Sequence, residues 1–152
     1  MNRKITTILS ALLLAAVSFY FASSNGDTAQ STQPATSLVA IGGDAAIAAA
    51  FRERRSDIEV ETRGTVIKLL PDDTRGSRHQ RFILRLGSGQ TVLVSHNIDL
   101  APRIDALKTG DELSLRGEYE WNERGGVVHW THHDPQGRRT GGWIRHRDRI
   151  YQ

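Results

Sequence analysis

Cysteine is absent from this chain of 152 residues, and proline is scarce, with four residues against 14 glycines. The absence of cysteine excludes disulfide bonds, a lipid attached through sulfur, thiolate metal ligands and cysteine nucleophiles. A folded domain must therefore depend on its hydrophobic core for stability. Any catalytic or metal chemistry must come from histidine, carboxylate or hydroxyl side chains. The low proline and high glycine content suits short strands joined by tight turns.

The chain also lacks a large excess of charge of one sign. Lysine and arginine number 20, against 17 acidic residues. Two of the basic residues, Arg3 and Lys4, lie at the extreme N-terminus, so residues 25–152 carry 18 basic and 17 acidic side chains and a net charge of +1. Because proteins that bind nucleic acid draw their affinity from many basic contacts, this balance is weak support for such a ligand.

One long apolar stretch is present, and it is confined to residues 5–22, directly after Arg3 and Lys4. This pattern predicts an export signal in residues 1–24, either a cleaved signal peptide or an uncleaved anchor that spans the membrane with residues 5–22. We favour cleavage, because small residues occupy positions 22–24. Both interpretations predict a periplasmic or extracytoplasmic domain, which is tethered to the inner membrane if the segment is retained.

Residues 25–43 are small and polar and are expected to form a flexible linker, with a single domain over residues 44–152. Asp44 is a candidate N-cap for a short N-terminal helix that ends near Arg55. Ile47 and Phe51 lie four residues apart on one face of that helix. We expect this face to close one end of the domain.

The remainder of the chain predicts strands, because apolar and polar residues alternate along it. Gly64 lies inside the first strand and predicts a bend there. Between the third and fourth strands, Leu100, Ile104 and Leu107 recur at helical spacing after Asp99, which predicts a short helix. The five expected strands cover residues 58–69, 80–86, 91–96, 112–121 and 127–132.

Three strands, a helix and two further strands follow the order of an OB-fold, a five-stranded, partly open Greek-key barrel. The predicted fold class is therefore mainly β: a small OB-like Greek-key barrel with an N-terminal helix and a short helix between strands three and four. An SH3-like or other small barrel is the alternative. Folds of this kind host many activities, so the function must be inferred from particular side chains.

Four motifs carry a resemblance to a known family: RHQRFI at residues 78–83, HNIDLAPR at 96–103, GEYEWN at 117–122 and HWTHHDP at 129–135. In this order the motifs are similar to those of a family of short, exported bacterial proteins known only as a domain of unknown function. The resemblance covers about residues 58–152. It implies a bacterial, exported protein and no particular activity, cofactor or substrate.

Metal-capable side chains are concentrated at His129, His132, His133 and Asp134. In an extended strand His129 and His133 share one face and His132 points to the other, so they converge on one ion only if the strand ends near Thr131. The spacing matches no standard zinc signature. We favour histidines that hydrogen-bond at the rim of the barrel, with no cofactor required, over the alternative of a divalent metal site.

Basic and histidine side chains also gather where strands two and three meet at one end of a hairpin, and Trp121 and Trp130 flank the hairpin between strands four and five. They suit an anionic or oligosaccharide ligand, because arginine binds anionic groups and aromatic rings stack on ligands. The alternative is that they stabilise the end of the barrel by hydrogen bonds, ion pairs and packing. The candidate ligand-binding residues are Arg78, His79, Arg81, His96, Asn97, Arg103, Trp121 and Trp130.

The favoured hypothesis is a non-enzymatic extracytoplasmic module that binds a polyanion, an oligosaccharide or an envelope protein partner through this rim. Nucleic acid is a less favoured ligand because of the charge balance and the expected location. A second hypothesis is a metal-assisted hydrolase of phosphodiester-type substrates, with His79, His96, His129 and His133 as ligands or bases, although no motif supplies a nucleophile. A third is a structural or envelope-stress protein without a small ligand.

Overall fold

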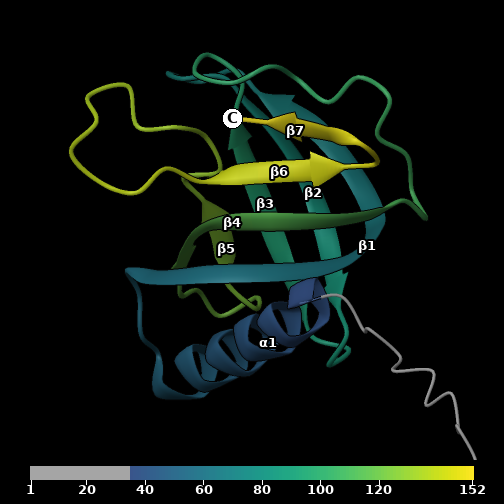
Figure 1. Cartoon of the computed structure of the whole chain (residues 1–152), viewed down its shortest axis with the longest axis vertical. Coiled ribbons are helices and arrows are strands. Elements are labelled where there is room, and N and C mark those ends of the chain that lie inside the picture. Colours follow the sequence, from purple (N-terminus) through teal and green to yellow (C-terminus); the bar gives the residue numbers. More distant parts are fainter. Residues whose placement is uncertain (1–34) are drawn as a thin grey trace, which may run out of the picture. The chain divides into compact units, whose positions relative to one another are not determined.

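The computed structural model describes residues 35–152, with side chains from Gly42 onward. The expected export signal, and residues 25–34 of the expected linker, lie outside the described residues. The described part is mainly β (Figure 1). Its elements are α1 (Ala35–Glu53), β1 (Ile58–Asp73), β2 (His79–Leu86), β3 (Thr91–Asn97), β4 (Glu112–Glu120), β5 (Val127–His129), β6 (Trp143–His146) and β7 (Arg149–Tyr151).

Five strands pair in a closed ring. β1 pairs with β2, β2 with β3, and β4 with both β1 and β5, in each case antiparallel, whereas β3 and β5 are parallel. β6 and β7 form a hairpin that adds to β4, so that all seven strands belong to one sheet. Among residues 35–152, no helix combines the length and hydrophobicity needed to cross a bilayer.

β1 is long because its first half pairs with β4 and its second half pairs with β2. Residues 58–65 pair with β4, and the pairing with β2 begins at Gly64. A Cβ atom at position 64 would lie 2.3 Å from the carbonyl oxygen of Arg85, which is far inside van der Waals contact. The glycine that predicted a bend therefore lies where β1 passes from one partner strand to the other and where the β2 backbone comes closest.

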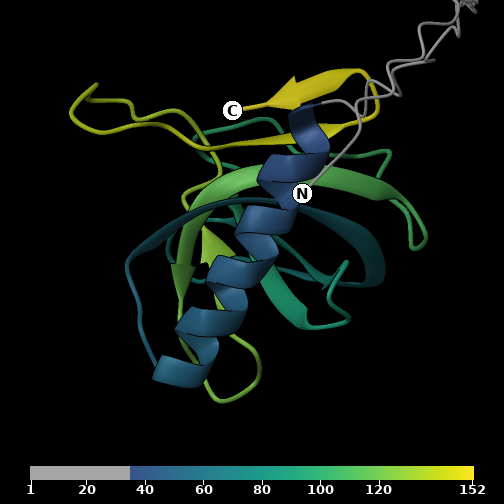
Figure 2. The ribbon, with the colours of Figure 1, turned by 60° about the horizontal axis from the view of Figure 1, so that its bottom comes forward.

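The core lies inside the ring, and alternate residues of β2, β3 and β4 point into it. This burial confirms the alternation seen in the sequence. Removing each large apolar side chain from water contributes about 1.5–3 kcal/mol. Figure 2 shows α1 running across the ring, and its Ile47 and Ala50 belong to the same buried cluster. The largest fully buried side chains are Tyr119, Phe82, Ile47, Leu84, Ile104, Leu115 and Ile144.

The N-terminal helix begins at Ala35, nine residues before the expected N-cap, so residues 35–43 are helical rather than linker-like. Asp44 lies inside the helix, and its carboxylate accepts hydrogen bonds from the Thr62 hydroxyl and the Ser88 N–H. The expected capping role of Asp44 is therefore wrong. The residue instead attaches α1 to the sheet, and Gly43 allows the close approach, since a Cβ there would lie 2.0 Å from the Glu61 carbonyl oxygen.

The short helix expected between strands three and four is also wrong, because residues 98–111 form turns. The Gln80 side chain forms hydrogen bonds with both the N–H and the carbonyl group of Ile104. In a helix these two main-chain groups would instead bond to residues four positions away along the chain. Ile104 and Leu107 are buried, but Leu100 is 37% exposed, so the three residues share no buried face. Side-chain contacts from a distant strand override the local periodicity here.

The C-terminal third differs from expectation in two ways. The last expected strand ends at His129 instead of residue 132, because Trp130 adopts a left-handed backbone conformation with φ 54°. β6 and β7 were not expected, since they span only four and three residues and are rich in arginine. Their inward-facing residues Ile144, His146 and Tyr151 are buried and extend the core.

Candidate functional site

The three arginines of the predicted ligand-binding rim are already engaged within the protein. Each guanidinium group donates to a nearby acceptor at 2.7–3.4 Å. An anionic ligand at this end of the sheet would compete with these acceptors for the guanidinium groups. The acceptors are Asp99 for Arg78, the Pro71 carbonyl oxygen for Arg81, and both Asp72 and Asp105 for Arg103.

His96 is fully buried and has both ring nitrogens occupied. Its Nε2 atom lies 3.2 Å from the Pro102 carbonyl oxygen, which can only accept, so Nε2 carries the proton. Nδ1 then accepts from the Thr131 hydroxyl at 2.8 Å. Burial, which disfavours the charged ring, lowers the pKa of His96 to about 4. His96 is therefore a neutral structural residue under physiological conditions.

His79 lies across the sheet from Asn97, whereas His96 lies across from Gln80. The two histidines thus point to opposite faces of the hairpin, and they do not form an acid–base pair. His79 Nδ1 donates to the Ser77 carbonyl oxygen at 2.8 Å. Asn97 accepts from the Asp99 N–H at 2.9 Å and shapes the turn after β3.

The two tryptophans of the predicted rim are held in different parts of the domain. Trp121 Nε1 donates to the Phe51 carbonyl oxygen at 3.1 Å and so fastens the end of α1. Trp130 Nε1 donates to the Thr140 carbonyl oxygen at 3.3 Å, and the Arg139 guanidinium lies 4.4 Å from the centre of the Trp130 ring. The predicted rim residues therefore do not come together as one surface.

The predicted metal ligands also separate. His132 is buried, and its Nδ1 atom donates to the His133 carbonyl oxygen at 2.7 Å, while the His133 side chain is exposed. Burial lowers the pKa of His132. The Asp134 carboxylate accepts three backbone N–H groups of the loop that follows it, and the first of these, from Gln136, contributes most to the lowering of its pKa. Of the four, only His129 belongs to a group of three metal-capable side chains close enough to share an ion in the described part of the chain.

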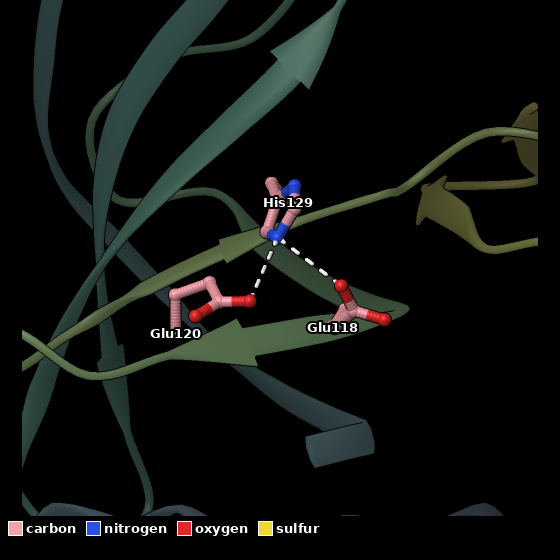
Figure 3. A group of neighbouring side chains, drawn as sticks. All are labelled: Glu118, Glu120 and His129. Carbon is pink, nitrogen blue, oxygen red and sulfur yellow. Dashed lines mark ion pairs between the residues drawn. The ribbon is translucent and has the colours of Figure 1, made fainter. Parts of the chain in front are cut away.

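His129 lies directly across from Glu118 in the β4–β5 pair, and Glu120 follows on the same face of β4 (Figure 3). His129 Nε2 is 3.5 Å from Glu118 Oε1 and 3.6 Å from Glu120 Oε1. That Nε2 atom is buried and has no hydrogen-bond partner. Sequence reasoning missed the two glutamates, although their i and i+2 positions on a strand opposite a histidine are the pattern that brings three such groups together.

A second feature missed by the sequence is a cavity of about 540 Å³ on the outer face of the sheet. Arg63, Arg85, Arg145 and Arg147 line it, and we call these four residues and the cavity the arginine pocket. Arg63 lies across from Ser114, which in turn lies across from Arg145, so that three strands bring the guanidinium groups to one face.

The arginines of the arginine pocket outnumber the carboxylates that line it. Among residues 35–152, no carboxylate lies within 4.0 Å of Arg63, Arg85 or Arg145, and Arg147 is 3.9 Å from Asp111. Two acidic residues, Asp44 and Glu112, line the cavity, and the carboxylate of Asp44 is occupied by Thr62 and Ser88. The small lining residues that leave the space open are Gly64, Thr65, Gly87 and Ser114.

Comparison with known protein families gives one match. A family model described as "Protein of unknown function (DUF3465)" matches residues 31–152, a range that contains all four motifs noted in the sequence. No curated protein matches the chain. The match covers most of the chain and confirms the resemblance to a domain of unknown function. The chain therefore belongs to the DUF3465 family.

Proposed function

We propose that this domain is a non-enzymatic module that binds a polyanion in the arginine pocket. The observation that carries the proposal is the contrast between the two groups of arginines. Arg78, Arg81 and Arg103 are engaged by acceptors of the protein, whereas Arg63 and Arg85 have no carboxylate partner among the described residues and converge on a cavity.

The chemistry of the pocket favours anionic groups. A guanidinium group presents a planar fork of N–H donors that matches phosphate, sulfate and carboxylate oxygens, often in bidentate geometry. Paired strands place the main chains of Arg63, Arg85 and Arg145 so that their side chains share one face of the sheet. The cavity volume of about 540 Å³ falls within the range of small-ligand sites, so it accommodates a short anionic segment of a longer polymer.

The same lining residues disfavour the other two kinds of ligand considered from the sequence. Oligosaccharide sites usually present an aromatic ring on which a sugar face stacks, and no aromatic side chain lines the arginine pocket. A protein interface usually has an apolar centre, whereas Leu86 and Leu113, which line the pocket, are themselves buried. We therefore favour a polyanion over a sugar or a protein partner.

We also propose that the ring of strands is an OB-like Greek-key barrel. The circular order β1-β2-β3-β5-β4 and the parallel contact between β3 and β5 support this proposal. The arginine pocket lies on β1, β2, β4 and β6, so the ligand would use a face that includes the C-terminal hairpin. A periplasmic or extracytoplasmic location stays a prediction from residues 1–24, and it would present the pocket to anionic polymers of the cell envelope.

The test compares binding of inorganic polyphosphate and of neutral dextran by the purified protein, measured by isothermal titration calorimetry. The double variant R85E/R145E is expected to bind polyphosphate at least about tenfold more weakly, because two charge-assisted contacts become repulsive. The matched control is R124E/R138E, which makes the same change of charge at exposed arginines outside the pocket.

The control variant is expected to bind within about twofold of the unaltered protein, since only distant screened charges change. Equal losses in the two double variants would show binding by overall charge alone and would overturn the assignment to the pocket. Equal affinity for dextran and polyphosphate would overturn the proposed ligand class.

A further inference from the structure

We propose that Glu118, Glu120 and His129 form a binding site for a divalent transition-metal ion such as Zn²⁺ or Mn²⁺. The three ligand atoms lie within 4.8 Å of one another and come from two adjacent strands (Figure 3). This set shares only His129 with the ligands expected from the sequence. It lies on β4 and β5 and includes none of the residues that line the arginine pocket, so the proposal is independent of the polyanion site.

The separations between the three groups are too long for hydrogen bonds and suit a shared ion. Nitrogen-to-oxygen hydrogen bonds span about 2.7–3.2 Å, whereas His129 Nε2 is 3.5 and 3.6 Å from the nearest oxygens of Glu118 and Glu120. An ion bonded at about 2.0–2.2 Å in tetrahedral geometry holds its ligand atoms roughly 3.4 Å apart. The imidazole therefore lies at ligand-to-ligand spacing from each carboxylate, and the two carboxylate oxygens lie within 4.8 Å of each other.

The burial of the histidine nitrogen is a second observation. His129 Nε2 is buried and has no hydrogen-bond partner, which is unfavourable for a polar atom. It faces two carboxylate oxygens, as Figure 3 shows. A bound cation would satisfy the nitrogen and both carboxylates at once. The side chains of His129 and Glu120 are 38% and 30% exposed, so the group lies near the surface of the domain although Nε2 itself is covered.

Neighbouring side chains orient one of the ligands. Arg139 binds the second carboxylate oxygen, Oε2, of Glu118 and leaves Oε1 directed toward His129. The Arg139 guanidinium is itself fixed over the Trp130 ring at 4.4 Å. Hydrogen bonds of this kind to the far oxygen of a ligating carboxylate commonly orient metal ligands. Arg139 is thus a positioning residue for Glu118.

The donor set indicates which ions fit. Imidazole is a poor ligand for Mg²⁺ and Ca²⁺, which prefer oxygen, whereas Zn²⁺ binds imidazole and carboxylate together and Mn²⁺, which favours carboxylates, binds such sites more weakly than Zn²⁺. Two carboxylates balance the charge of a divalent ion, and Arg139 draws part of the negative charge of Glu118. We therefore expect Zn²⁺ and Mn²⁺ to bind and Mg²⁺ to bind much more weakly.

The test titrates the purified protein with Zn²⁺, Mn²⁺ and Mg²⁺ and records the heat of binding and the melting temperature. One bound Zn²⁺ per chain and a raised melting temperature are expected. The variant E120Q/H129Q should lose at least about tenfold in affinity for Zn²⁺, in line with the loss of ligands or their supports at metal sites. The matched control E123Q/H133Q, which makes the same chemical changes at exposed residues, should bind as the unaltered protein does.

Three outcomes would overturn the proposal: no binding of Zn²⁺ or Mn²⁺ by the unaltered protein, equal losses in both double variants, or a loss in the control alone. The single variant E120Q guards against misfolding, because glutamine retains the shape of the side chain. It must keep its circular dichroism spectrum and its affinity for polyphosphate while its affinity for Zn²⁺ falls. Failure of polyphosphate binding in every variant would count against the arginine pocket and leave the metal result unaffected.

Discussion

The side chain of Gln80 and the main chain of Ile104 form a closed pair of hydrogen bonds. Gln80 Nε2 donates to the Ile104 carbonyl oxygen at 3.0 Å, and the Ile104 N–H donates to Gln80 Oε1 at 2.9 Å. Both residues are buried, so water cannot replace either bond. This one amide therefore fastens the connection between β3 and β4 to the inside of the sheet.

Replacement of Gln80 by leucine is expected to lower the free energy of unfolding by about 2–4 kcal/mol, because it leaves two buried main-chain groups without partners. Urea denaturation followed by circular dichroism measures this change. Q80E retains the acceptor, but it buries a charge and sets a carboxylate oxygen against the Ile104 carbonyl oxygen, so at neutral pH it should be at least as destabilising as Q80L. The control Q136L, at an exposed position, should change stability by less than about 0.5 kcal/mol, and a similarly small effect of Q80L would contradict this account.

Stability is expected to fall with acidification between about pH 6.5 and pH 4 because of His96. Its pKa is about 4 in the folded protein and near 6.5 when unfolded. The unfolded state therefore binds more protons in this window, and the stabilising effect is fully present above the upper pKa and lost as the pH falls toward the lower one. The shift corresponds to a contribution of up to about 3 kcal/mol.

The measurement is urea denaturation at a series of pH values for the unaltered protein, H96Q and H133Q. H96Q should show a smaller slope of stability against pH, since glutamine does not titrate. It should keep part of the slope, because burial also lowers the pKa of His132. H133Q replaces an exposed histidine and should follow the unaltered protein; a slope unchanged by H96Q would refute the assignment.

Alanine at two adjacent glycines of α1 should change stability in opposite directions. Gly42 is exposed, and no atom lies within 4 Å of the position that a Cβ would occupy there, so G42A should stabilise the helix by about 0.5–1 kcal/mol. At Gly43 a Cβ would lie 2.0 Å from the Glu61 carbonyl oxygen, so G43A must displace α1 and should cost about 1–3 kcal/mol. Thermal melting of both variants measures the two changes in stability. Stability changes of the same sign in G42A and G43A would show that α1 does not pack on β1 in this way.

Binding of polyphosphate should weaken as salt concentration rises, because each contact releases counterions from the polymer. A plot of the logarithm of the binding constant against the logarithm of the salt concentration should be linear. R85E/R145E should reduce the magnitude of its slope by about 2, one for each contact removed. R124E/R138E should leave the slope nearly unchanged. A slope reduced equally in both would place the bound polymer outside the arginine pocket.

The strands were predictable where one face of the sheet is buried. Phe82, Leu84 and Val94 alternate with partly exposed residues because they point into the ring, so a pattern of period two is present in the sequence. The same reasoning failed for residues 98–108, where apolar residues recur at helical spacing and the main chain is instead bonded by Gln80. The contact between Gln80 and Ile104 joins residues 24 positions apart, so the local pattern of apolar residues does not reveal it.

The candidate sites depend on register, which a single strand does not reveal. Arg63 and Arg145 meet on one face only because each lies across from Ser114. Glu118 and His129 are brought together by pairing between β4 and β5. By contrast, the left-handed turn at Trp130 separates His129 from His132 and His133 of the predicted cluster, and neighbouring residue types did not signal this turn.

Closure of the ring also bears on how copies of this chain behave toward one another. An unpaired strand edge exposes main-chain donors and acceptors and is a template for aggregation. In the described part of the chain, each of the five ring strands pairs with a neighbouring strand on both sides. β7, at the outer end of the sheet, is only three residues long and begins with Arg149. The domain thus offers little edge for intermolecular strand addition, so it should remain dispersed at concentrations where an open sheet of this size would assemble.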